Sequence, residues 1–224
     1  MEKKIRNIRK LKESRISKIK NNETPLPFYK NGKVVFHLIP NTSINFGQYY
    51  NLEKVNSSNL IPFVANNWNT TYNVDGILTY GKHSNKEEVY TYVQFFRNGI
   101  IEAVDGYLLQ AKQEKYIPIS SIEEEIINKS TNYVNVLKEL HIESPIYSFL
   151  TILDVRGYVV PTDRMPWVNT HPIEREILTL PEVKIDIHSF EPSKVFRYCF
   201  DSIWNACGIS KSPNYNEKGE WYIR

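Results

Sequence analysis

The sequence predicts a single α+β domain: a mixed sheet of five to six strands flanked by two main helices, with an amphipathic basic helix at the N-terminus. Three observations favour this class. Short apolar runs such as KVVFHLIP alternate with turn residues, and 13% of the 224 residues are aromatic, as expected where strands dominate. Segments near 120–140 and 193–207 space their apolar side chains as helices do. Residues 1–22 form a third helical segment, which leaves 23–224 as the domain.

The strands follow from runs of apolar and β-branched residues. KVVFHLIP, VDGILTYG and the nearly continuous apolar run PIYSFLTILDV each predict one strand. ILTLPEVKIDIH predicts another, and Pro181 inside it is typical of an edge strand or a bulge. Residues 41–73 are rich in Asn and weakly patterned, so we expect a long loop there. In the helix near 120–140, Ser120 and Glu123 fit the spacing of a capping box.

The N-terminal helix carries five aliphatic side chains on one stripe, namely Ile5, Ile8, Leu11, Ile16 and Ile19. Nine Lys or Arg and two Glu give residues 1–20 a net charge of +7, so the remainder of the chain carries −4. An acidic body disfavours a nucleic-acid groove across it. The helix itself is open to three interpretations: a linker that packs on a neighbouring domain, a phosphate-binding arm, or a membrane-surface helix. We expect it to project from the domain and to dock through its stripe.

YVQFFRNGIIEAVDGYL predicts a β-hairpin, because Asn98-Gly99 favours a two-residue type I′ turn. This register places Phe95 opposite Glu102 and Tyr92 opposite Asp105. Glu102 then shares a face with three apolar side chains, Val93, Phe95 and Val104.

Arg97, Glu102 and Asp105 are the charged residues of this hairpin. A carboxylate buried there would have a raised pKa and could act as an acid or a base. Buried charges are usually paired, however, so we interpret the three as structural charges, with an Arg from a neighbouring strand as the partner of Glu102. Near the C-terminus, we expect Asp201 to anchor the tail through a hydrogen bond.

A second catalytic possibility rests on Asp154, at the end of one predicted strand, and on Glu182 and Lys184 in the next. In D…ExK nucleases two carboxylates hold Mg²⁺ and a lysine orients water. E-x-K is common by chance, so this is the alternative hypothesis. It requires the three side chains to converge on one exposed spot.

Hydropathy and cysteine spacing limit the cellular location and the covalent and metal chemistry that we expect. No run approaches the roughly 20 apolar residues that span a bilayer, and the N-terminus has no secretory h-region, so we expect a cytoplasmic protein. Cys199 and Cys207 are eight residues apart in one predicted helix, about 12 Å, which is too far for a disulfide. The sequence has no CxxC pair, and we expect neither a metal nor a cofactor.

Seven segments together resemble a known family: ETPLPF, VVFHLIP, NVDGILTY, YVQFFRNGIIEAVD, LTLPEV, FDSIWNACG and SPNYNEKGEW. From about residue 15 onward, the chain resembles the C-terminal region of bacterial proteins whose N-terminal half is a Schlafen-type AlbA domain, a module associated with DNA or ATP binding.

The resemblance implies context rather than a mechanism. The AlbA half has no counterpart here, so its contacts with DNA or ATP cannot be assigned to residues of this chain. We expect a non-catalytic accessory or partner-binding module in DNA-linked regulation or phage defence. Its partner would be an upstream or separate AlbA-type domain or a second copy of the chain. Contact with nucleic acid would be only indirect, and none is expected with a membrane.

Overall fold

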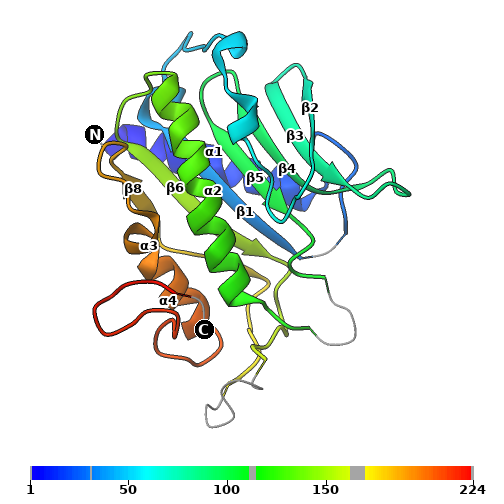
Figure 1. Ribbon diagram of the computed structural model, residues 1–224, viewed down its shortest axis with the longest axis vertical. Coiled ribbons are helices and arrows are strands. Elements are labelled where there is room, and N and C mark those ends of the chain that lie inside the picture. The colour runs from blue at the N-terminus through cyan, green and yellow to red at the C-terminus, as the bar shows by residue number, and fades with distance from the viewer. Residues whose placement is uncertain (1, 31, 111–114, 162–169, 223–224) are drawn as a thin grey trace.

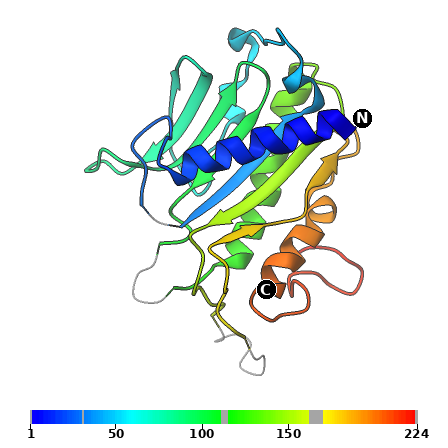
Figure 2. The same ribbon diagram turned by 180° about the vertical axis from the view of Figure 1, so that it is seen from behind.

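The computed structural model describes residues 2–30, 32–110, 115–161 and 170–222. One eight-stranded sheet lies at the centre, with helices on both of its faces (Figures 1 and 2). The helices and strands, in chain order, are α1 (Glu2–Lys20), β1 (Lys33–Pro40), η1 (Asn41–Ile44), η2 (Leu52–Lys54), η3 (Ser57–Asn59), β2 (Asn69–Tyr72), β3 (Gly76–Lys82), β4 (Val89–Phe96), β5 (Ile101–Asp105), α2 (Ile119–Glu139), β6 (Ile146–Leu153), β7 (Ile177–Thr179), β8 (Val183–Ile185), α3 (Pro192–Val195) and α4 (Arg197–Asn205).

The α+β class is confirmed, but two details of the predicted sheet are wrong. The sheet has eight strands rather than five or six, and it is not mixed, because all pairings between its named strands are antiparallel. Short turns connect β2 to β3, β3 to β4 and β4 to β5, and such turns reverse the chain direction. Strand β2 lies inside the Asn-rich stretch predicted as loop.

The strand order is β2-β3-β4-β5-β1-β6-β7, and β8 pairs with the other end of β6. All eight residues of β1 are buried, as expected for a central strand. The segment with Pro181 lies at the edge, as its sequence indicates, and is split there: β7 pairs with Thr151–Leu153, and β8 pairs with Ile146–Ser148.

The register of the β4–β5 hairpin differs from the prediction by one residue. Gln94, not Phe95, lies opposite Glu102, and Thr91 lies opposite Asp105. Gly99 has a φ of +87°, whereas Asn98 is not among the positive-φ residues, so a type I′ turn is not formed. The loop therefore has three residues, 97–99, with Gly99 in the left-handed region. One residue of slip moves every side chain of β4 to the other face relative to β5.

The face of the sheet that α2 covers holds the larger core. Phe36 of β1 lies near its centre, with its ring centroid 6.5 Å from Phe63, 6.4 Å from Tyr133 and 5.6 Å from Phe196. Helix α2 confirms the predicted helix near 120–140, but the capping box is wrong, since the helix begins at Ile119 without a side-chain cap. The predicted terminal helix is broken at Phe196 into α3 and α4.

Helix α1 lies flat across the opposite face of the sheet, so the prediction that it projects is wrong (Figure 2). Ile8 and Ile19 are fully buried, Ile16 is 9% exposed, and Ile5 and Leu11 are partly buried. The aliphatic stripe therefore docks on the sheet of its own chain, because that face carries apolar side chains from β1, β4 and β6 that also require burial. The charged side chains of α1 lie mainly on its outer side.

Candidate functional site

Glu102 lies on the α1 face of the sheet, fully buried in a network of four polar residues. Arg15 of α1 donates Nε and Nη2 to the two carboxylate oxygens, both at 2.8 Å. Tyr92 donates its hydroxyl to Oε1 at 2.9 Å, and Nε2 of His37 lies 3.0 Å from Oε2. Val93 and Phe95 belong to the other face, so only Val104 of the expected neighbours shares this one.

This network keeps Glu102 ionised. Burial alone would raise its pKa, but hydrogen bonds and charge from Arg15 and His37 lower the pKa to about 2. Both oxygens are engaged by protein donors, so the carboxylate has the arrangement of a structural charge rather than of an acid or base. Its partner comes from α1 and not, as expected, from a neighbouring strand.

Asp105 points to the opposite face, three residues along β5, and is also fully buried. Its Oδ1 accepts the backbone N–H groups of Tyr107 at 3.0 Å and Leu108 at 2.8 Å. Its Oδ2 has no hydrogen-bond partner in the described part of the chain. Burial, and to a lesser extent the carboxylate of Glu125, raise the pKa of Asp105 to about 7.

Arg97 is exposed in the turn and donates Nε to the carbonyl of Val74 at 3.0 Å. The three charged residues of the hairpin are therefore separate: one on each face of the sheet and one at its end.

The structure does not bring Asp154, Glu182 and Lys184 together. Lys184 pairs with Tyr147 at the start of β6, whereas Asp154 follows the end of that strand. Seven residues of strand separate them, about 23 Å. Glu182 is already bound by Arg9 of α1, which donates Nε to Oε2 at 2.8 Å and Nη2 to Oε1 at 2.6 Å. No cluster of potential metal ligands occurs among the described residues.

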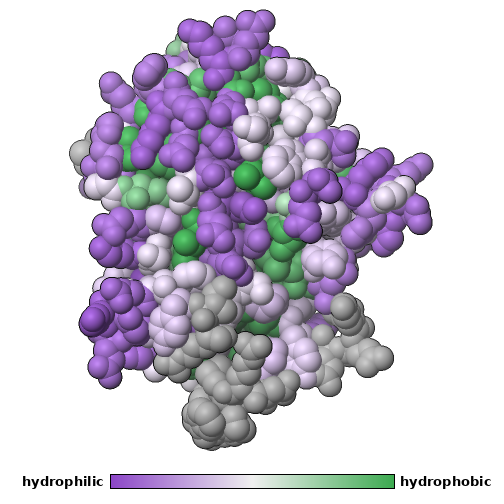
Figure 3. All heavy atoms as spheres, in the orientation of Figure 1, coloured by the Kyte–Doolittle hydropathy of each residue, from purple (hydrophilic) through white to green (hydrophobic). Residues whose placement is uncertain are grey.

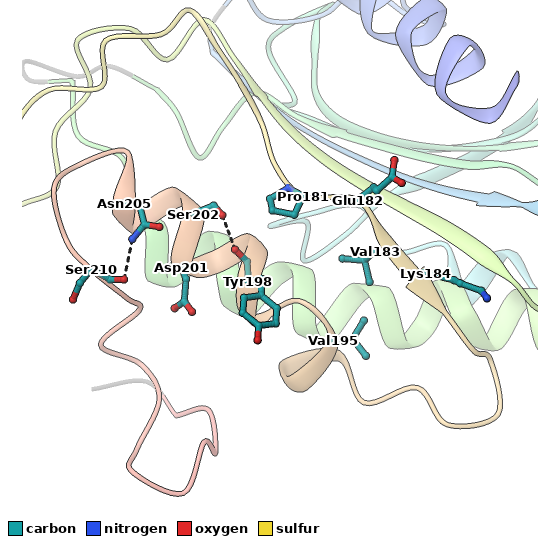
Figure 4. A pocket seen from close by; sticks show the side chains of 10 residues that line it. All are labelled: Pro181, Glu182, Val183, Lys184, Val195, Tyr198, Asp201, Ser202, Asn205 and Ser210. Carbon is teal, nitrogen blue, oxygen red and sulfur yellow. Dashed lines mark hydrogen bonds between the residues drawn. The ribbon is translucent and has the colours of Figure 1, made fainter. Parts of the chain in front are cut away.

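Glu182 and Lys184 instead line a groove of about 600 Å³ between β8 and α4 (Figure 4). Val183 and Val195 approach each other from the two walls, while Glu182 extends toward α1 and Lys184 extends away from α4. The other lining residues come from the turn before β8, from α4 and from the tail: Pro181, Tyr198, Asp201, Ser202, Asn205 and Ser210.

A second hollow of about 570 Å³ adjoins the groove and shares Tyr198 and Asp201 with it. The side chain of Tyr198 is largely open to solvent, with the residue 76% exposed. The rest of the second hollow is lined mainly by cations, namely Lys194, Arg197 and Lys218. The two hollows form one continuous surface with an exposed aromatic ring at its middle.

The tail that closes one end of the groove is held by a third buried carboxylate, Glu123 of α2. Its two oxygens accept four hydrogen bonds of 2.7–2.9 Å, from the indoles of Trp204 and Trp221, from Ser212 and from Asn214. This role was missed because Glu123 fits a capping box in sequence, and none of its partners lies within 80 residues.

Two polar side chains of α4 also hold the tail. Asp201 accepts the backbone N–H of Ser212 at 2.8 Å, which confirms its predicted anchoring role. Asn205 donates to the carbonyls of Ile209 and Ser210, both at 2.9 Å. The wall of the groove is thus fixed by hydrogen bonds at both its helix and its tail.

Comparison with known proteins gives no relative. No protein-family model, no curated protein and no solved structure matches the chain.

Proposed function

We propose that this chain is a non-catalytic partner-binding module of a bacterial Schlafen AlbA-type system, acting in the cytoplasm in DNA-linked regulation or phage defence. The AlbA-type domain would be its partner, either upstream on the same polypeptide or on a separate protein. The seven sequence segments that resemble the C-terminal regions of such proteins supply this context. The groove between β8 and α4 is the structural observation that carries the binding role.

The contacts of three acidic side chains support a binding role over catalysis. Glu102 is occupied by Arg15, Glu123 by donors of α4 and the tail, and Glu182 by Arg9. A general acid or base must reach a substrate proton, and a metal ligand must offer a lone pair to the ion. These carboxylates offer their lone pairs to other parts of the same chain.

The charge distribution supports an indirect relation to nucleic acid. Of the nine Lys and Arg in residues 1–20, Arg9 and Arg15 are bound by carboxylates of the domain, and Lys12 is buried. The rest of the chain carries a net charge of −4. We therefore assign phosphate contacts to the AlbA-type partner. In the described part of the chain, no helix has the length and apolar character needed to cross a bilayer.

The test is a binding measurement with a purified AlbA-type domain from the same genome. Light scattering after size exclusion should give the mass of a mixed complex at micromolar concentration. Absence of a complex, with both proteins folded, would contradict the proposed function. A nuclease assay with Mg²⁺ addresses the alternative: cleavage that is lost in Asp154→Asn, Glu182→Gln and Lys184→Gln variants would revive the D…ExK hypothesis.

A further inference from the structure

We infer that the β8–α4 groove binds an extended acidic peptide, which adds to the sheet as a new strand along the outer edge of β8. This inference rests on the proposed partner-binding function and specifies its site and the chemistry of the bound segment. Three features of the groove carry it: the open backbone edge, the apolar and aromatic walls, and the surrounding charge.

The backbone edge of β8 is open. Among the described strands, β8 pairs only with β6. Leu180 donates its N–H to the carbonyl of Leu150 at 3.1 Å. The backbone groups of the even-numbered residues of β6 therefore point toward β7 and β8. Val183 and Ile185, which face Ser148 and Ile146, then bond to β6, and the N–H and C=O of Lys184 between them point outward. These two outward backbone groups can bond to an added strand.

The walls suit the alternating side chains of an added strand. Val183 and Val195 make the two walls apolar, and the ring of Tyr198 stands beside them (Figure 4). Side chains of an extended peptide alternate between two directions. One set would enter the groove against these residues, and the other would face the side of the sheet where α1 lies. The three residues of β8 span about 10 Å, enough for a core of three to four peptide residues.

The charges around the groove favour an acidic ligand. Of its two carboxylates, Glu182 is paired with the cation of Arg9, and Asp201 accepts the backbone N–H of Ser212. Within the described residues, Lys184, Arg197 and Lys218 form no salt bridge. Cations at the rim steer an anionic partner and set its specificity.

The experiment uses the full chain and three fluorescein-labelled hexapeptides. The first alternates Asp or Glu with Val; the second replaces each acidic residue by Lys; the third carries Pro at the centre of the acidic sequence. Fluorescence anisotropy should show binding of the acidic peptide, at least tenfold weaker binding of the other two, and weakening by added salt. Proline cannot donate to a strand ladder, so the third peptide reports strand addition rather than charge alone.

Variants locate the site. Lys184→Pro removes the outward N–H at an edge position where proline is tolerated, so we expect the thermal unfolding temperature to stay close to that of the wild type while peptide binding falls at least tenfold. Tyr198→Ala should also weaken binding. Tyr72→Ala is the matched control, since Tyr72 is 65% exposed but lies in β2 at the opposite edge of the sheet.

Three results would overturn the inference: no binding of the acidic peptide at millimolar concentration, equal binding of the basic peptide, or unchanged binding by a folded Lys184→Pro variant. Self-association of the chain that Lys184→Pro abolishes would assign the groove to a second copy instead. The binding measurement with the AlbA-type domain distinguishes failure of the proposed function from failure of the peptide site. If the wild type forms the AlbA complex but binds no acidic peptide, the proposed function stands and the peptide site is refuted.

Discussion

Asp105 provides the sharpest test of how the buried polar groups are balanced. Like Glu123 it is a buried carboxyl with no cation against it, but its Oδ2 has no hydrogen-bond partner in the described part of the chain. In the Asp105→Asn variant the side-chain carbonyl can still accept from Tyr107 and Leu108, as Oδ1 does. The substitution therefore removes the titrating group while it keeps the local turn.

The magnitude follows from the pKa of Asp105, which is about 7 in the folded chain against an ordinary value of 3.8. Below pH 3.8 both states are protonated, and the group contributes nothing to the pH dependence. As the pH rises to 7, only the unfolded chain ionises, so wild-type stability falls, and above pH 7 the penalty is constant. The full penalty is about 4 kcal/mol, of which about 3 kcal/mol accumulates between pH 5 and pH 8.

Urea unfolding at pH 5, 6, 7 and 8 measures this penalty. The free energy of unfolding of Asp105→Asn minus that of the wild type should rise by about 3 kcal/mol over this range. At pH 5 the variant is expected to be the less stable protein by about 1–3 kcal/mol, because its amide N–H₂ would be buried without acceptors. Asp75→Asn, at an exposed turn position, is the matched control for replacing a carboxylate by an amide. Parallel curves for Asp105→Asn and the wild type would refute the reasoning.

Three further predictions concern the other buried groups. Glu102→Gln should lower the free energy of unfolding by about 3 kcal/mol at pH 7. The folded-state pKa of Glu102 is lowered to about 2 from 4.5, so this stabilisation is present above pH 4.5 and is lost as the pH falls toward 2. Wild type and variant should therefore approach each other in urea unfolding as the pH is lowered to about 2. Glu123→Gln should cost about 2–4 kcal/mol and red-shift tryptophan emission, because it places an amide N–H₂ against hydrogen-bond donors that include Trp221; unchanged emission and stability would contradict its anchoring role. Ile8→Asp should lower the free energy of unfolding by about 3 kcal/mol or more, whereas Asn7→Asp on the exposed side of α1 should change it little. Equal thermal unfolding of the two variants would show that the stripe is not buried in solution.

The sequence was sufficient to predict the elements of the larger core. Apolar periodicity located α2 and the strands β1 and β6, because burial on a regular element leaves a regular pattern. It failed for the four-residue strand β2, whose residues are all exposed and therefore show no alternation. The hairpin register failed for a different reason. Asn-Gly is compatible with both a two-residue and a three-residue loop, and the choice depends on packing beyond the turn.

The polar sites were only partly predictable, since their partners are distant in sequence. A buried Glu102 with a cationic partner could be expected, but nothing local indicates that Arg15, 87 residues away, is that partner. Glu123 shows the same limit more strongly, because its spacing from Ser120 fits a cap that does not form. Patterns within one element report its own burial, whereas a contact between elements depends on the whole fold.

The buried carboxylates also explain why the groove exists where it does. Glu102 fixes α1 to the sheet through Arg15, and the same helix then reaches the start of β8 through Arg9 and Glu182. Glu123 fixes the tail against α2 and α4, and the tail closes the groove on the far side of α4. Neither segment adds a strand to β8, which pairs only with β6 among the described strands, so its outer edge stays open. Loss of the tail anchor in Glu123→Gln should therefore weaken peptide binding in the groove even though Glu123 lies outside its lining, whereas the solvent-facing Asn7→Asp change on α1 should not.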